Sequence, residues 1–289
     1  MAFIAAAAVC KYIPVLFPHN HYFWRTMKHL PNLLTLGNLF CGCIAIAYIL
    51  TAQPYTSLSL EGGMPTWNWV YGAEQIYFGS IFIGIAAIFD LLDGITARAL
   101  KVFSPIGKDL DSLADVVSFG VAPSVILYKF LWDALMSEKN AMDVSMLGMA
   151  PAFLIACFAA LRLARFNIST TGHKGYFSGM PTPAVGIFVA SLPMLAWFNP
   201  WGAGSLLHNK WVLYLIIAVL CWLMVSSITF FKLMPAKWSI GTAWPQLVLV
   251  LLSIAALFVL GIAAAIPFAF ILYILLSLVG PKPRTEVAE

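Results

Sequence analysis

Eight long apolar stretches constrain the fold of this chain more than any other feature of its sequence. They cover residues 33–51, 76–98, 113–132, 146–164, 183–199, 211–231, 244–260 and 262–279. A helix of about 20 apolar residues spans the hydrocarbon core of a bilayer. The chain is also 62% hydrophobic and only 10% charged, whereas roughly a quarter of the residues in a soluble protein are charged. We therefore predict an all-α integral membrane protein with about eight transmembrane helices.

The basic residues predict how these helices are oriented. If both termini are cytoplasmic, all of the 16 Lys and Arg residues except Lys129, Lys139 and Lys210 lie on the inner side. Such a bias marks the cytoplasmic side of a membrane protein. We therefore expect a multi-pass protein of the inner membrane with both termini in the cytoplasm. The net charge of +4 favours an anionic leaflet or a phosphate-bearing substrate, and it does not imply nucleic acid.

The connection at residues 52–75 is polar and aromatic. Its Trp67, Trp69 and Tyr71 are typical of an aromatic belt at the membrane interface. We expect this segment to be an interfacial anchor on the outer side rather than a functional loop.

Acidic side chains gather in residues 90–115, although the whole chain has only 12 of them. Asp90 and Asp93 are three residues apart and share one face of a helix. Asp111 and Asp115 are four residues apart and share a face of the next helix. Because carboxylates at membrane depth are costly, this cluster is a functional site by default, placed by the basic residues at the cytoplasmic face.

Two features of the intervening sequence predict that the four acids meet. Gly94 and Ala97 add almost no bulk to the face that carries Asp90 and Asp93, so another backbone or a ligand can approach closely. Ser104, Pro105 and Gly107 indicate a bend, after which an antiparallel helix returns the second acidic pair to the first. We expect Asp109, two residues before Asp111, to point away into solvent.

This carboxylate cluster predicts a metal site. Four carboxylates in a poorly hydrated place repel one another unless cations neutralise them. Oxygen ligands without His or Cys suit Mg²⁺ or Mn²⁺ rather than zinc or copper. Mg²⁺ usually binds one or two carboxylates together with substrate phosphates, so a phosphate-bearing substrate is indicated. We expect two divalent ions, which can stabilise both the attacking and the leaving oxygen of a displacement at phosphorus.

Two alternatives to a metal site remain open. The acids can pair with Arg98, Lys101 or Lys108 merely to stabilise the fold. They can also line the pathway of a cation or proton transporter. Neither alternative accounts for the order in which Gly, Ala and Arg alternate with Asp.

The acidic segment resembles the signature of the CDP-alcohol phosphatidyltransferase family. The pattern is DxxDGxxARx8GxxxDxxxD, and every position of it is matched, by Asp90, Asp93, Gly94, Ala97, Arg98, Gly107, Asp111 and Asp115. The resemblance implies a six-helix core whose cytoplasmic cavity binds the CDP group. It also implies a homodimer.

The resemblance extends over residues 30–235, which it implies to be the catalytic core of six helices. From hydropathy and charge we expect residues 1–29 to form an N-terminal cytoplasmic or interfacial segment and residues 281–289 to form a cytoplasmic tail. Residues 236–280 hold two additional helices, for which we expect packing or subunit contact.

The resemblance also implies roles for the signature residues. Asp90, Asp93 and Asp111 ligate the metal ions, and Asp115 combines ligation with the role of general base. The nucleotide and the diphosphate are bound by Gly94, Ala97, Arg98 and Gly107.

Polar residues in the first apolar stretch lie on one helical face. Thr35 and Asn38 are three residues apart, and Gly42 follows one turn later. They bind either the nucleotide with its diphosphate or, as the alternative, a neighbouring helix through a hydrogen bond. With Pro31 and Asn32 they resemble the first helix of family members that use L-serine.

A second basic cluster follows the fourth apolar stretch. Arg162 and Arg165 share a helix face and suit a phosphate or a carboxylate, although positive-inside anchoring also places Arg here. Residues 162–167, including Asn167, and residues 177–183 again resemble family members that use L-serine. We therefore expect CDP-diacylglycerol and L-serine as substrates, with Arg162, Arg165 and Asn167 at the acceptor. Glycerol phosphate, an inositol or choline as acceptor remains the alternative.

Overall fold

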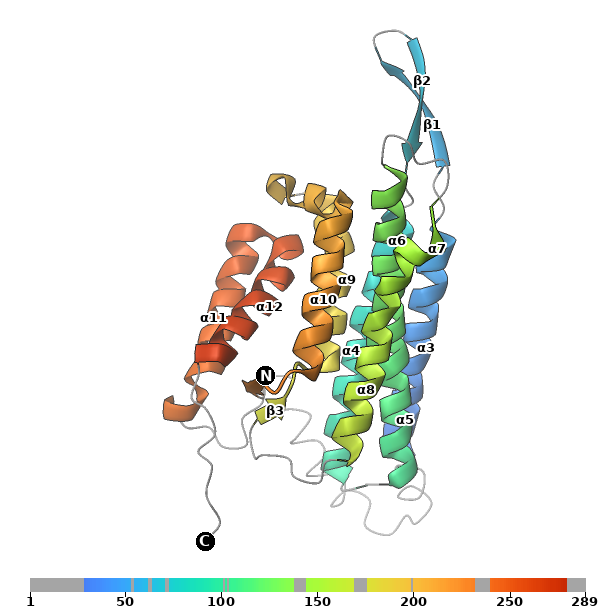
Figure 1. The fold of residues 1–289 in the computed structure, drawn as a ribbon. Helices are drawn as coiled ribbons and strands as arrows, with labels where there is room; N and C mark the ends of the chain where they lie inside the picture. The colour runs from blue at the N-terminus through green and yellow to red at the C-terminus, as the bar shows by residue number, and fades with distance from the viewer. Residues whose placement is uncertain are drawn as a thin grey trace, which may run out of the picture.

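The computed structural model describes residues 29–52, 55–61, 64–70, 73–100, 102, 104–137, 144–168, 176–198, 200–231 and 240–279. The predicted tail at 281–289 and all but the last residue of the segment at 1–29 lie outside these ranges. Helices dominate the described part of the chain (Figure 1).

The helices follow the eight apolar stretches. Their bounds are α3 (Leu30–Thr51), α4 (Ala73–Leu100), α5 (Pro105–Asp115), α6 (Ala122–Met136), α7 (Met146–Met149), α8 (Leu154–Ile168), α9 (Thr182–Phe198), α10 (Lys210–Val225), α11 (Ile240–Leu260) and α12 (Ile262–Val279). A π-helical turn at Val116–Val121 joins α5 to α6, and a 3₁₀ turn at Ala150–Phe153 joins α7 to α8.

Among the described residues, five helices are long enough and apolar enough to span a membrane. They are Leu30–Thr51, Glu74–Leu100, Pro105–Met136, Met146–Ile168 and Ile262–Val279. Helix α9 meets them only together with the 3₁₀ segment 202–208, from which it is bent by 119°. Two further apolar helices, Lys210–Val225 and Trp244–Leu260, are shorter. The all-α membrane fold is confirmed, and the full number of eight crossings stays a prediction.

Two short antiparallel strand pairs add to the helices. Strands β1 (Tyr55–Glu61) and β2 (Met64–Val70) form a hairpin in the connection that we expected to be an interfacial anchor. In Figure 1 this hairpin extends beyond the end of the bundle opposite to the start of α5. Strands β3 (Tyr176–Ser178) and β4 (Thr229–Phe231) pair at the other end, below α10. The sequence prediction contained no strands. Strands β3 and β4 have three residues each, which is too short for an alternating pattern. Strands β1 and β2 lie in the connection that we interpreted only as an interfacial anchor.

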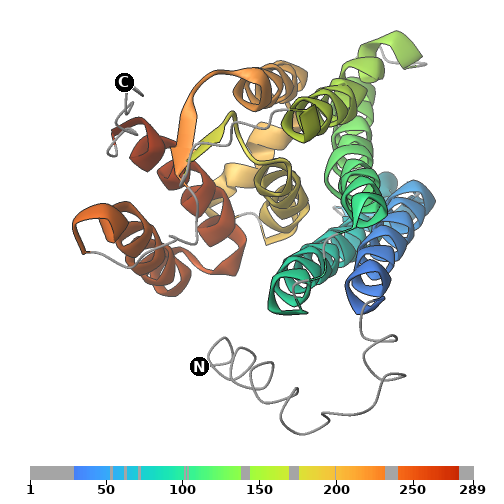
Figure 2. The same ribbon diagram turned by 90° about the horizontal axis from the view of Figure 1, so that it is seen from below.

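Helices α3, α4 and α5 lie side by side, and α9 joins them to the C-terminal pair α11 and α12 (Figure 2). Helix α9 packs against both α4 and α12. Phe188 of α9 stacks on Phe270 of α12, with ring centroids 4.2 Å apart. Large apolar side chains such as Phe40 face outward, as expected where lipid replaces water around the bundle.

A small residue allows α3 to approach the π-helical turn. A Cβ atom at Gly42 would overlap Ser118 Oγ and lie 2.9 Å from Ser118 Cα. Ser118 Oγ instead donates a hydrogen bond to the carbonyl of Asn38, at 3.0 Å. The glycine therefore brings the polar face of α3 next to the end of α5.

The bend predicted between the two acidic pairs is present. Ser104 is the N-cap of α5, because its Oγ accepts a hydrogen bond from the amide of Gly107 at 2.9 Å. Pro105 occupies the first turn, where its missing N–H costs nothing. These two local signals start α5 where it packs on α3, the helix that also packs against α4.

Candidate active site

Three carboxylates from two helices meet in the half of the bundle in which α4 ends and α5 begins. Both of these helix ends lie at the bottom of Figure 1. Oxygen atoms of Asp90, Asp93 and Asp111 all lie within 4.8 Å of one another. Asp93 is buried, and the other two are half-buried. Asp109, on the same helix as Asp111, is exposed, as expected.

Asp93 is oriented by the first helix. Thr35 Oγ1 lies 2.7 Å from Asp93 Oδ2 and 3.0 Å from the carbonyl oxygen of Pro31. Because a hydroxyl has one hydrogen, it donates to one of these oxygens at a time, and the bond to the charged carboxylate is the stronger. The structure thus assigns Thr35 the interhelical hydrogen bond that the sequence left as an alternative, and its partner is a site carboxylate.

Asp115 lies beside this group and outside it. Its side chain is buried, and Asn38 Nδ2 donates to its Oδ1 at 3.3 Å. It interacts electrostatically with Asp90, Asp111 and Asp93. All four predicted acids are therefore close enough to influence one another's charge. The π-helical turn begins directly after Asp115, a distortion that is frequent at functional sites.

The donor set fits a hard divalent cation. Asp111 Oδ1 is buried and has no hydrogen-bond partner among the described residues. Within the same residues, no ion pair joins any of the four acids to Lys or Arg. Buried carboxylate oxygens without a cation are costly, and oxygen ligands are those that Mg²⁺ and Mn²⁺ prefer. Asp90, Asp93 and Asp111 can therefore hold a metal ion.

The basic neighbours have other partners, which argues against structural ion pairs. Arg98 Nε donates to the carbonyl of Gly94 at 2.8 Å. Lys108 Nζ donates to the carbonyl of Asn167 at 3.0 Å. Lys101 lies outside the described residues.

The small signature residues leave space at the carboxylates. A Cβ atom at Gly94 would meet only Arg98 Nη2, at 3.8 Å, so this face of α4 is open. A Cβ atom at Gly107 would lie 3.0 Å from Asn32 Oδ1, so this glycine lets α5 approach the start of α3. Ala97 is half-buried on the same helix as Gly94. The roles of these residues toward a nucleotide stay predictions.

The two predicted acceptor arginines differ in burial. Arg162 is buried, and its Nη1 donates to Thr182 Oγ1 at 2.9 Å. Its Nε is buried without a hydrogen-bond partner in the described part of the chain, and it interacts electrostatically with Asp115. Arg165, one turn later, is exposed. Only Arg162 therefore reaches toward the carboxylates.

Asn167 contacts another helix. Its side-chain Nδ2 donates to Ser112 Oγ at 2.7 Å, and its backbone carbonyl oxygen accepts from Lys108 Nζ. These two bonds hold the end of α8 on α5. A role for Asn167 toward an acceptor stays a prediction.

Sequence reasoning gave no individual role to several polar residues that support the site. Thr182 holds Arg162, Ser118 holds Asn38, and Ser112 holds Asn167. Each is a hydroxyl in or next to an apolar stretch, and such a residue needs a buried partner. The position of these hydroxyls in the sequence could therefore have indicated a buried hydrogen bond, although not the residue that makes it.

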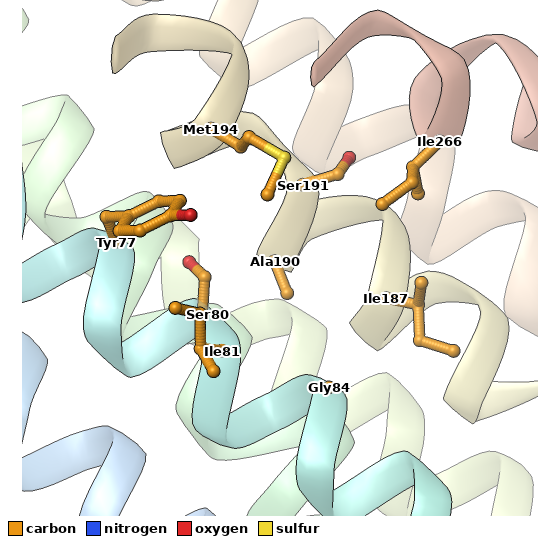
Figure 3. Close-up of a pocket in the computed structure, with 9 residues that line it drawn as sticks. All are labelled: Tyr77, Ser80, Ile81, Gly84, Ile187, Ala190, Ser191, Met194 and Ile266. Carbon is orange, nitrogen blue, oxygen red and sulfur yellow. The ribbon is translucent and has the colours of Figure 1, made fainter. Parts of the chain in front are cut away.

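A separate groove of about 170 Å³ lies between α4, α9 and α12 (Figure 3). Tyr77, Ser80 and Met194 point into it. Ser80 Oγ donates to the carbonyl of Ile76, and Ser191 Oγ donates to that of Phe188. The hydroxyls of Ser80 and Ser191 are thus used within their own helices, and most of the other lining residues are apolar, so the groove is suited to hydrocarbon rather than to a nucleotide.

The fold and the carboxylate group define an integral membrane protein with a candidate metal-dependent active site. The chain belongs to the CDP-alcohol phosphatidyltransferase family, whose model matches residues 28–222. This is a family of phosphotransferases, and the protein is an enzyme of that class.

Curated relatives carry a narrower name. The chain is 33% identical over 231 residues to the "CDP-diacylglycerol--serine O-phosphatidyltransferase" of Helicobacter pylori (strain J99), covering 79% of this chain and 81% of that protein. It is 29% identical over 204 residues to the Bacillus subtilis (strain 168) protein of the same name, covering 71% and 90%. It is 30% identical over 203 residues to the "Archaetidylserine synthase" of Methanothermobacter thermautotrophicus, covering 70% and 69%.

Proposed function

We propose that this protein is a phosphatidylserine synthase, which transfers the phosphatidyl group of CDP-diacylglycerol to the hydroxyl of L-serine and releases CMP. The observation that carries this proposal is the buried Arg162, which interacts electrostatically with Asp115, together with the names of the relatives. Serine carries a carboxylate that a buried guanidinium can bind, whereas choline carries none.

The donor end of the site is formed by the signature on α4 and α5. A divalent metal, Mg²⁺ or Mn²⁺ and in our proposal two ions, would be held by Asp90, Asp93 and Asp111 and would neutralise the diphosphate and the leaving CMP. The open face at Gly94, with Arg98 beside it, has room for the nucleotide and its diphosphate.

The acceptor end is formed by Asp115 and Arg162. In our proposal Arg162 binds the carboxylate of serine, and Asp115 accepts the proton of the serine hydroxyl. The hydroxyl oxygen bonds to the lipid-linked phosphorus, and the bond from that phosphorus to the oxygen bridging to CMP breaks. Asn38 and Ser118 hold Asp115 in place by hydrogen bonds through α3. Positioning of the hydroxyl contributes much of the acceleration, because a carboxylate is a weak base for an alcohol.

We place the protein in the inner membrane as a homodimer with the carboxylates facing the cytoplasm, where CMP and serine are accessible. The distribution of basic residues supports this orientation. The hairpin β1–β2 would then lie on the outer side. Family resemblance alone supports the dimer.

A panel of acceptor alcohols tests the proposed function. Purified protein is incubated with CDP-diacylglycerol, Mg²⁺ or Mn²⁺, and L-serine, ethanolamine, glycerol 3-phosphate, inositol or choline, while CMP and lipid products are followed. We expect serine-dependent CMP release and phosphatidylserine. Turnover of another alcohol without a serine product would overturn the serine assignment. Absence of metal-dependent CMP release with every alcohol would instead favour the transporter alternative.

Arg162→Lys is expected to raise the KM for serine by about tenfold, because lysine cannot replace two parallel guanidinium hydrogen bonds to a carboxylate. The variant should also prefer serine over ethanolamine less than the wild type does, because ethanolamine lacks the carboxylate. Steady-state kinetics with both alcohols measures this. Arg165→Lys is expected to have a smaller effect, since Arg165 is exposed. An equal rise in KM for serine and ethanolamine would show that Arg162 does not bind the carboxylate.

A further inference from the structure

Helix α12 lies outside the part of the chain that matches the family model, yet it reaches the acceptor end of the site. Tyr273 is buried, and its hydroxyl donates to the carbonyl of Phe231 in β4 at 3.0 Å. The ring of Tyr273 also contacts the rings of Phe230 and Phe231 in that strand. The distance between ring centroids is 5.6 Å for Phe230 and 4.9 Å for Phe231. Tyr273 therefore fixes β4 by one hydrogen bond and two aromatic contacts.

Strand β4 in turn fixes β3 and the residues after it. Phe231 pairs with Tyr176 and Thr229 with Ser178 in the antiparallel ladder. Beyond the ladder, the amide of Gly179 donates to the carbonyl of Ile228 at 2.9 Å.

The chain then turns into α9. Gly179 has a φ of +75°, and a Cβ atom there would overlap the carbonyl oxygen of Met224, so this close approach requires glycine. The next amide, of Met180, donates to the carbonyl of Leu223 at 3.0 Å. Two residues later, Thr182 starts α9.

Thr182 completes the connection to the site. Its hydroxyl accepts from Arg162, and Arg162 interacts electrostatically with both Asp115 and Tyr273. A continuous set of contacts thus runs from Tyr273 through β4 and β3 to Thr182 and Arg162. Since Arg162 carries an unpartnered buried Nε, its position decides what it can bind.

We propose that Tyr273 is a positioning residue for the acceptor alcohol, which acts by holding the strand pair β3–β4 and through it Thr182 and Arg162. This inference rests on the proposed function of Arg162 at the acceptor. Helix α12, which lies outside the residues matched by the family model, would then contribute to the choice and binding of the alcohol as well as to packing.

Tyr273→Phe tests this role, because it removes only the hydroxyl and keeps the ring that packs on Phe230. The KM for the acceptor is expected to rise about fivefold, as for the loss of one buried hydrogen bond, while the KM for CDP-diacylglycerol stays unchanged. Amide hydrogen exchange at Gly179 and Met180 is expected to become faster, because the amide of Gly179 donates to Ile228 directly before β4 and Met180 is the next residue along the chain.

Tyr214→Phe is the matched control. The Tyr214 hydroxyl also donates to a backbone carbonyl, that of Gly148 at 2.7 Å, but at the opposite end of α10 from β4. This variant should change neither the acceptor KM nor the exchange at Gly179 and Met180. An equal change in both variants, or an unchanged acceptor KM in Tyr273→Phe, would overturn the proposal.

The outcome for Tyr273 is separable from that for serine. If the wild type turns over an alcohol other than serine, the serine assignment fails, and the same comparison is made with the KM for that alcohol. The exchange measurement needs no substrate, so unchanged exchange at Gly179 and Met180 in Tyr273→Phe would overturn the positioning role whichever alcohol is used.

Discussion

Asp111→Asn is expected to lower metal-dependent CMP release by about three orders of magnitude, because a metal ion contributes several kcal/mol of charge stabilisation at a diphosphate. Asparagine keeps the size of the side chain and removes its charge. The Asp111 Oδ1 atom is already buried without a partner in the described chain, so the substitution removes a ligand rather than a structural bond. Mn²⁺ binding, followed by electron paramagnetic resonance, should weaken together with activity.

Asp109→Asn is the matched control for this result. Asp109 is on the same helix, two residues from Asp111, and it is exposed. The same substitution there should leave Mn²⁺ binding unchanged and activity within about twofold, as for other surface changes. Similar losses in both variants would indicate that the charge of α5, and not a ligand, matters. Full activity of Asp111→Asn would remove Asp111 from the metal site.

Local signals explain why much of this fold could be predicted. Apolar length predicted the helices, because a bilayer requires backbone hydrogen bonds to be made within each segment. The start of α5 was predictable from Ser104 and Pro105, since an N-cap and a first-turn proline act within one turn of helix. The acidic pairs followed from helical spacing in the same way.

Long-range contacts explain what could not be predicted. Thr35 and Asp93 are 58 residues apart, and Tyr273 and Phe231 are 42 apart, so no spacing rule connects them. The spacing of Arg162 and Arg165 predicted a shared face, but the depth of each depends on which neighbour covers it. Arg162 is covered by the start of α9, where Thr182 lies, and Arg165 is exposed.

The π-helical turn after Asp115 is a further case. Its sequence, VVSFGV, contains Ser118 and Gly120 but no proline, so nothing in it predicts a widened helical turn at this place. Gly120 lies against α8, where a Cβ atom would come within 3.2 Å of Ala159 Cβ. This packing of the turn against α8 is a long-range contact, which the local sequence does not reveal.

Asp115→Asn is expected to lower kcat by about 10²- to 10⁴-fold, the range typical of a lost general base. The asparagine amide cannot accept the proton of the serine hydroxyl. Asp115 lies outside the group of three carboxylates that meet within 4.8 Å, so Mn²⁺ affinity should fall less than in Asp111→Asn. Rapid-quench measurement of CMP release with saturating serine, together with Mn²⁺ binding, separates the two effects.

The same substitution at Asp111 and at Asp115 is thus expected to differ in its effect on metal binding. Asp111→Asn should lose metal binding and activity together, whereas Asp115→Asn should lose activity while much of the metal binding remains. Asn38 donates to Asp115, so the substituted amide must rotate to present its oxygen to that donor, and the side chain can stay in place. If Asp115→Asn keeps near-normal turnover with metal bound, another group accepts the proton. If it loses metal as completely as Asp111→Asn, Asp115 is a ligand first, and its role as base has no separate support.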